Sequence, residues 1–327
     1  MTLFPLAGLV AGLAMMAAAA PPLRLEHKVE MPDVDGRIDH LSIELKTGRL
    51  FMAALGHDTV EVIDVSAARR IQTLRGVPEP QGVLYVPAAN RLFVASGRDG
   101  GVRVFDGTTL KALLTVPFGD DADNLRLDPV SGRIWVGYGA GALAAMGTDG
   151  VKAADIPVGG HPESFQLEKN GSRIFVNVPS AAKIAVVDRT RSAVIANWTT
   201  GDATANYPMA LDEGHQRLFV VCRHPARLLV LDTATGAIVA TLPTVGDADD
   251  VFYDAGNRRI YVSGGEGVVS VIQQTDADHY RPLGRTTTEV GARTALFVSA
   301  KHTLYVAVPH RGAQAAELRP FEAPKPN

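Results

Sequence analysis

The sequence predicts an all-β domain built from seven similar units, and two observations carry this prediction. One motif recurs every 40–44 residues: an Arg or Thr, then Leu or Ile, an aromatic residue, and Val or Met. After the apolar N-terminus, no stretch of about ten residues shows helical periodicity. A period near forty is typical of propeller blades or of a solenoid. The seven copies begin at Arg49, Arg91, Arg133, Arg173, Arg217, Arg259 and Thr303.

The N-terminal segment, residues 1–19, is predicted to be a secretory signal peptide. Leu3–Ala20 is apolar and ends in small residues, which is the pattern of a cleavable signal. No Lys or Arg precedes this run, so a membrane anchor of about 18 residues is the alternative. Cleavage after Ala19 would leave residues 20–327 as one domain. We then expect a periplasmic or secreted protein that keeps no membrane span.

Each repeat is predicted to contain four short strands. In the second repeat these are Gly82–Val86, Arg91–Ser96, Val102–Asp106 and Leu113–Val116. The runs are rich in β-branched and aromatic residues, and Gly, Asp or Asn separates them. Several third strands end in Asp, as at Asp106 and Asp232. We expect these carboxylates to bond the backbone of their own turn, which is a structural role.

The two ends of the repeat array favour a closed ring over an open solenoid. The last repeat offers three strands, at Ala295–Ser299, Thr303–Val308 and Ala315–Phe321. A spare strand, Leu23–Glu30, precedes the first repeat. If this strand completes the last blade, the ring closes and no long edge is left unpaired. The predicted architecture is therefore a seven-bladed β-propeller of four-stranded antiparallel blades, closed by the N-terminal strand.

Gly76–Val83, Arg91–Val94 and Val102–Asp106 together resemble the YVTN-type β-propeller repeat. Tyr261–Gly264 approaches the tetrapeptide that names this repeat, although no copy spells it fully. The resemblance covers nearly all of the chain after the leader and implies an exported bacterial propeller, often one without an assigned reaction. The wider propeller class also includes gluconolactonase-type lactonases and quinoprotein dehydrogenases. The sequence has two tryptophans and no tryptophan-docking motif of the quinoprotein kind.

Charge and cysteine content exclude some classes of partner. The net charge is −3, and Lys and Arg are scattered along the chain. This distribution argues against nucleic acid or an anionic membrane surface as the main partner. Cys222 is the single cysteine, so no disulfide can form within the chain.

Aligning the repeats reveals a column of polar residues in the loops that enter the first strand of each blade. Ten positions before each motif stand Asp39, Gln81, Asp123, Glu163, Tyr207, Asp249 and Arg293. The next position adds His40, Asn124 and Asp250, whereas the preceding position is mostly apolar. In a propeller these loops open on one mouth of the central channel. We expect the column, with His40 and Asn124, to bind a small ligand, a cation or an envelope protein. A ring that is merely solvated is the alternative.

The acidic residues of this ring predict a cation. Converging carboxylates raise one another's pKa unless a positive group neutralises them, and Arg293 supplies one positive charge. Oxygen ligands suit Ca²⁺ or Mg²⁺. A mixed set of the type that gluconolactonase-like propellers use for a metal is formed by Asn124, Glu163, Asn206 and Asp250. This comparison rests on residue type alone.

Three functions are consistent with the sequence. The first is an exported binding or interaction propeller. The second is a metal-assisted hydrolase of a lactone, in which the metal polarises the carbonyl and His40, His161 or a ring carboxylate acts as base. The third is a structural subunit of an envelope complex. No nucleophile elbow and no phosphate-binding loop is present in the sequence.

Overall fold

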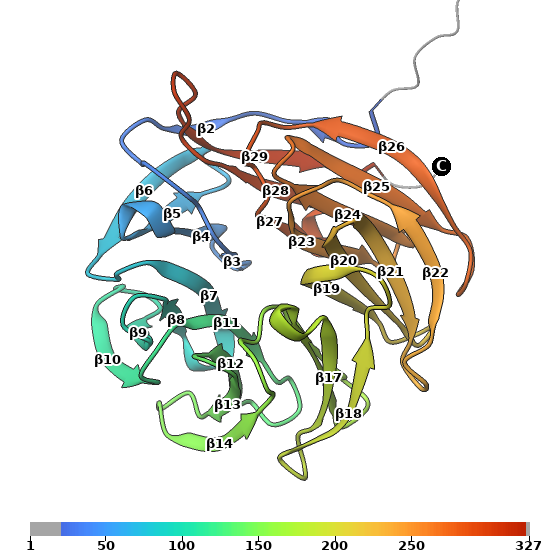
Figure 1. The fold of residues 1–327 in the computed structure, drawn as a ribbon. Coiled ribbons are helices and arrows are strands. Elements are labelled where there is room, and N and C mark those ends of the chain that lie inside the picture. The colour runs from blue at the N-terminus through green and yellow to red at the C-terminus, as the bar shows by residue number, and fades with distance from the viewer. Residues whose placement is uncertain (1–20, 325–327) are drawn as a thin grey trace, which may run out of the picture.

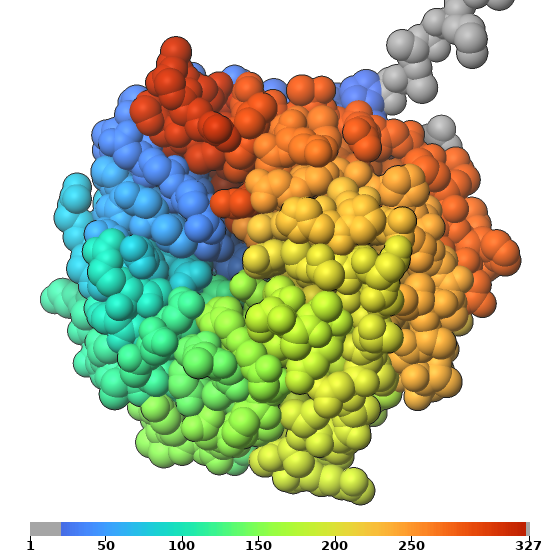
Figure 2. Space-filling view, viewed as in Figure 1, coloured from blue at the N-terminus to red at the C-terminus, as the bar shows by residue number. Residues whose placement is uncertain are grey.

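The structure, a computed structural model, describes residues 21–324, so the predicted signal peptide lies outside the described residues. Seven antiparallel sheets stand side by side around a central axis (Figure 1). In the space-filling view the blades follow one another around the disc in chain order, from blue to red (Figure 2). The prediction of a seven-bladed β-propeller is confirmed.

Six blades have four strands each, and within each blade the strands follow chain order from the axis to the rim. The first three blades are β3 (Leu41–Glu44), β4 (Arg49–Ala54), β5 (Thr59–Asp64) and β6 (Arg69–Arg75); β7 (Pro80–Val86), β8 (Arg91–Ser96), β9 (Gly101–Asp106) and β10 (Ala112–Pro117); and β11 (Ala122–Leu127), β12 (Ile134–Tyr138), β13 (Ala142–Met146) and β14 (Lys152–Pro157). The next three are β15 (Phe165–Leu167), β16 (Arg173–Val178), β17 (Lys183–Asp188) and β18 (Ala193–Thr199); β19 (Thr204–Asp212), β20 (Arg217–His224), β21 (Ala226–Asp232) and β22 (Ile238–Pro243); and β23 (Ala248–Asp254), β24 (Arg259–Gly264), β25 (Val268–Gln274) and β26 (Tyr280–Thr287).

The last blade combines both ends of the chain. It contains β27 (Ala295–Val298), β28 (Thr303–Val308) and β29 (Ala316–Glu322), together with β1 (Arg24–Leu25) and β2 (Val29–Met31). The helices among residues 21–324 are single 3₁₀ turns, at Leu55–His57, Pro87–Ala89, Pro179–Ala181 and Ser299–Lys301. Within this range, no helix has the length and apolar character that crossing a bilayer requires.

The recurring motif forms the second strand of every blade, and its alternation fills the spaces between blades. Successive side chains of a strand point to opposite faces of the sheet. In β4, Leu50 and Met52 belong to the core shared with the last blade. Phe51 faces the other way and stacks on Tyr85 of the second blade, with ring centroids 5.9 Å apart. One motif therefore supplies both inter-blade cores, which explains why it recurs in each blade.

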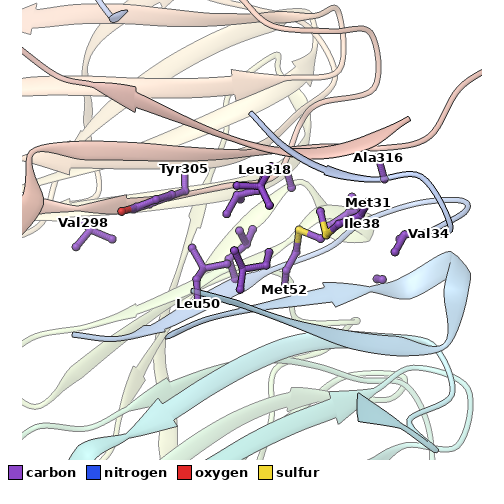
Figure 3. Packing of buried hydrophobic residues seen from close by; sticks show 14 residues of the cluster. Met31, Val34, Ile38, Leu50, Met52, Val298, Tyr305, Ala316 and Leu318 are labelled. Atoms are coloured by element: carbon purple, nitrogen blue, oxygen red, sulfur yellow. The ribbon is translucent and has the colours of Figure 1, made fainter. Parts of the chain in front are cut away.

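The N-terminal segment closes the ring, as the sequence predicts, but as two short strands. Both pair with β29, in registers that place Leu25 opposite Phe321 and Glu30 opposite Glu317. The link between them is held by a hydrogen bond from Glu26 N to Pro320 O, 3.0 Å long. Met31 then packs among residues of the first and last blades (Figure 3).

The turns after the third strands that end in Asp show the structural role predicted for this residue. The Asp106 Oδ1 atom accepts hydrogen bonds from the backbone N–H groups of Thr108 and Thr109, at 3.0 and 2.7 Å. Asp232 Oδ1 does the same for Ala234 and Thr235, both at 2.9 Å. These carboxylates are therefore occupied by their own turns.

Candidate functional site

The polar column surrounds one cavity at the mouth of the channel. The cavity measures about 260 Å³, and all seven residues ten positions before the motifs line it. They come from seven different blades and lie at the start of the innermost strand or in the loop just before it. The same wall includes His40 and His161, which the sequence had singled out.

Three further charged residues line this mouth cavity and were not predicted: Arg37, Asp121 and Arg223. Arg37, Asp121 and His161 occupy the position two residues before the column. Side chains two apart point to the same face of an extended chain, so period-two alternation could have identified Arg37 and Asp121. Arg223 comes from β20, the second strand of its blade, and no repeat pattern in the first strands points to it.

Two arginines neutralise one side of the mouth cavity. Arg223 Nη2 lies 2.6 Å from Asp249 Oδ1, and its guanidinium stacks over the Tyr207 ring at 3.8 Å. Arg293 contacts Asp247 at 2.9 Å and Asp249 at 3.3 Å. Asp249 is therefore paired with two guanidinium groups, and this part of the ring needs no further cation.

On the other side of the mouth cavity, neither Glu163 nor Asp39 has a guanidinium at hydrogen-bond distance. The Glu163 carboxylate makes no hydrogen bond and no ion pair to any residue between 21 and 324. Burial, and then the neighbouring Asp123, raise the pKa of Glu163 to about 8. Asp39 is 5% exposed, and burial raises its pKa to about 7. Its nearest cationic atoms, on His40 and Arg37, are 3.5 and 3.8 Å away.

The carboxylates around the two histidines of the site raise the pKa of both and favour their protonated forms. His161 Nδ1 donates to Gly139 O at 2.7 Å, and its Nε2 faces Asp123 Oδ2 at 3.8 Å. The interaction with Asp123 raises the pKa of His161 to about 9. Burial alone would lower the pKa of His40, but the neighbouring carboxylates, first Asp39, outweigh it and raise the value to about 10. In this state neither imidazole can accept a proton from water.

The four residues of the metal set expected from the sequence do not all line the mouth cavity. Glu163 lines the mouth cavity, whereas Asn206 is fully buried and donates to Asn177 Oδ1 at 2.9 Å and to Lys183 O at 3.0 Å. Asp250 accepts a hydrogen bond from the Ala295 backbone at 2.8 Å, and Asn124 donates to Asp123 at 3.3 Å. The amide nitrogens of both asparagines and one oxygen of Asp250 are therefore used in hydrogen bonds, and only Glu163 of this set lines the mouth cavity.

A different trio is close enough to share a metal ion. One ligand atom each from Asp123, His161 and Glu163 can lie within 4.8 Å of the others. Two carboxylates and one imidazole form a donor set that suits zinc and first-row transition metals better than Ca²⁺. His161 Nε2 would have to release its proton to bind a metal, so the affinity would rise with pH.

Together, the fold and this cavity define a seven-bladed β-propeller with a charged site at one mouth of its channel. No protein-family model matches the chain, so the YVTN resemblance stays at the level of the propeller class. The chain is 22% identical over 207 residues to "Uncharacterized protein YncE" of Salmonella typhimurium, and equally to the protein of the same name from Salmonella typhi. Each match covers 61% of this chain and 58% of the relative's length.

Proposed function

We propose that the protein is an exported propeller that binds a cation, either a metal ion or the cationic group of a small molecule, at the mouth of its channel. The observation that carries this proposal is the Glu163 carboxylate, which has no ion pair in the described residues, in the same cavity as Asp39, whose ion pairs to His40 and Arg37 are 3.5 and 3.8 Å long. Desolvated carboxylates that line one cavity attract a positive charge, because it removes both the repulsion and the need for protonation.

The protonation of the histidines favours binding over hydrolysis. A lactonase needs a base that can take a proton from water, and the raised pKa values of His40 and His161 favour their protonated forms. The hydrolase is therefore the second candidate. Turnover of a lactone panel that disappears on addition of a chelator would favour it over simple binding.

Cations are expected to stabilise the protein through Glu163. A ligand that binds only the folded state, at 100 times its Kd, adds about 2.7 kcal/mol of stability. For a domain of this size, that raises the Tm by about 5 °C. The measurement is thermal unfolding with Mg²⁺, Ca²⁺, Mn²⁺, Zn²⁺ and an organic diamine in turn. Glu163→Gln should abolish the response, because the amide keeps the shape and loses the charge.

The matched control is Asp232→Asn, which makes the same chemical change at a turn that lies outside the mouth cavity. This variant should keep the full response to the cation. If none of the cations moves the Tm of the unaltered protein, the proposal is wrong.

We also propose that the protein is exported and loses its leader. The proposal rests on the apolar run Leu3–Ala20 and its small-residue end. Mass spectrometry of protein recovered from the periplasm should give an N-terminus near Ala20. Recovery at the membrane of a chain that still starts at Met1 or Thr2 would contradict cleavage and support an anchor.

A further inference from the structure

A second cavity, of about 490 Å³, lies deeper in the channel and has no part in the function proposed above. The innermost strands line it, and His40 lies in the walls of both cavities. Seven positions before each motif, one residue per blade contributes to its wall. These residues are Ser42, Leu84, Arg126, Gln166, Ala210, Phe252 and Leu296. Arg126 is the charged member of this ring.

The Arg126 guanidinium has no carboxylate partner. No Asp or Glu oxygen in residues 21–324 lies within 4.0 Å of it, whereas Arg223 and Arg293 at the mouth are both ion-paired. Its one hydrogen bond within this part of the chain runs from Nη1 to Leu125 O, at 2.9 Å. A guanidinium carries five N–H donors, so most of them are free to bind a ligand.

The Arg126 side chain is half-buried in this wall. Burial lowers the pKa of its guanidinium, and the centre of the group lies 5.8 Å from the centroid of the Phe165 ring. A partly desolvated charge without a partner carries some of the cost of burying a charge, and an oppositely charged ligand group would offset it. The nearest carboxylate of the same wall, Asp250, is held by its hydrogen bond to Ala295.

The rest of the wall is mainly apolar at the level of Arg126. Leu84, Phe252 and Leu296 present hydrocarbon surface there. Ser42 Oγ accepts a hydrogen bond from Tyr85 N at 3.0 Å, which leaves its O–H able to donate. A cavity of several hundred Å³ that combines apolar side chains with a few polar groups is typical of small-molecule sites.

From these contacts we infer that the deep cavity binds an organic monoacid, with its carboxylate on Arg126 and its apolar body against Leu84, Phe252 and Leu296. The planar guanidinium matches a carboxylate through two parallel hydrogen bonds. Arg126 is the one charged residue of this ring, so further negative charges on a ligand would find no arginine partner there. One negative charge and a hydrocarbon body therefore fit this cavity.

Isothermal titration calorimetry with butanoate, hexanoate, octanoate and phenylpropanoate tests the inference. We expect saturable binding at one site, with the affinity rising about fourfold per added CH₂ until the cavity is full. Hexanol and inorganic phosphate should bind at least about 10-fold more weakly than hexanoate, since the first lacks the charge and the second lacks the apolar body. Absence of saturable binding by every carboxylate would overturn the inference.

Variants locate the site. Arg126→Met should weaken hexanoate binding at least about 10-fold, because it removes the charge-assisted hydrogen bonds. Arg98→Met removes an exposed arginine that pairs with Asp58 and Glu79 and should leave hexanoate binding unchanged. If Arg126→Met does not fold, Leu296→Trp, which places a larger side chain where the apolar body of the acid would lie, serves instead and should weaken binding. Unchanged binding by either folded variant of the deep cavity would refute the site.

This site is independent of the mouth cavity. Glu163→Gln changes the mouth only and should not weaken hexanoate binding. If Glu163→Gln lost hexanoate binding and Arg126→Met retained it, the acid would bind at the mouth cavity. That result would contradict the inference.

Discussion

A mature protein that lacks residues 20–32 is expected to melt more than about 10 °C below the intact protein. The deletion removes both strands that pair with β29 and leaves that strand as an open edge. It also removes Leu23, Val29 and Met31, which are 1, 3 and 0% exposed. Burial of three such side chains contributes roughly 5–9 kcal/mol, which approaches the whole stability of an ordinary domain.

Point variants separate the packing from the strand pairing. Met31→Ala should lower the free energy of unfolding by about 2–5 kcal/mol, because it opens a cavity in the core between the first and last blades. Glu30→Ala, at the neighbouring exposed position, should change it by less than about 0.5 kcal/mol. Urea denaturation measures both. A truncated protein that unfolds like the intact one would show that the ring closes without this segment.

Glu163→Gln is expected to raise the stability of the cation-free protein at alkaline pH. A carboxyl whose pKa is higher in the folded protein than in the unfolded chain keeps its proton up to a higher pH in the folded protein. For Glu163 the two values are about 8 and 4.5, so stability falls as the pH rises between them. Above about pH 8 the full cost of a desolvated carboxylate is present, on the order of a few kcal/mol.

The other shifted groups of the mouth cavity act in the same direction. Asp39 also lowers the stability of the fold as the pH rises from its unfolded pKa of 3.8 to its folded pKa of about 7. His161 and His40 stabilise the fold below pH 6.5, and this stabilisation is lost as the pH rises through about 9 and about 10. The unaltered protein should therefore lose stability steadily from about pH 5 to pH 9 when no cation is present.

The comparison of Tm values at pH 5 and pH 8.5 tests this prediction. Glu163→Gln should melt several degrees higher than the unaltered protein at pH 8.5 and nearly equally at pH 5. Asp106→Asn is the control, because the turn N–H groups of Thr109 and Thr108 lower the pKa of Asp106 and its carboxylate is already satisfied. It should show no gain at pH 8.5. Equal Tm values for Glu163→Gln and the unaltered protein at pH 8.5 would mean that Glu163 is well solvated.

Because one motif recurs in every blade, much of the fold could be predicted from the sequence. The motif that begins at Arg91 and its six relatives mark the second strand of each blade, and the strands around it follow from alternation and turn residues. The position ten residues before the motif is equivalent in every blade. Residues as distant as Asp39 and Arg293 therefore reach one cavity, since a closed ring brings equivalent positions to one axis.

The pairing of charges inside the mouth cavity could not be read from the repeat. Asp249 is neutralised by Arg223, which comes from another strand of the preceding blade, while Glu163 at the equivalent position has no such neighbour. Asn206 lies next to the ring in sequence, yet its amide bonds Asn177 within the core. Each contact depends on which way a side chain turns at a loop.

The sequence by itself determined the number of blades, the closure by the N-terminal segment and the ring of polar positions, because these follow from periodicity along the chain. Only the tertiary structure decided which carboxylates lack a partner, and that Arg126 lies unpaired in the deep cavity. The physical reason is that hydrogen bonds and ion pairs are made over about 3–4 Å. At that range, contacts between neighbouring blades decide which charged groups are paired, and the sequence of a single repeat does not contain these contacts.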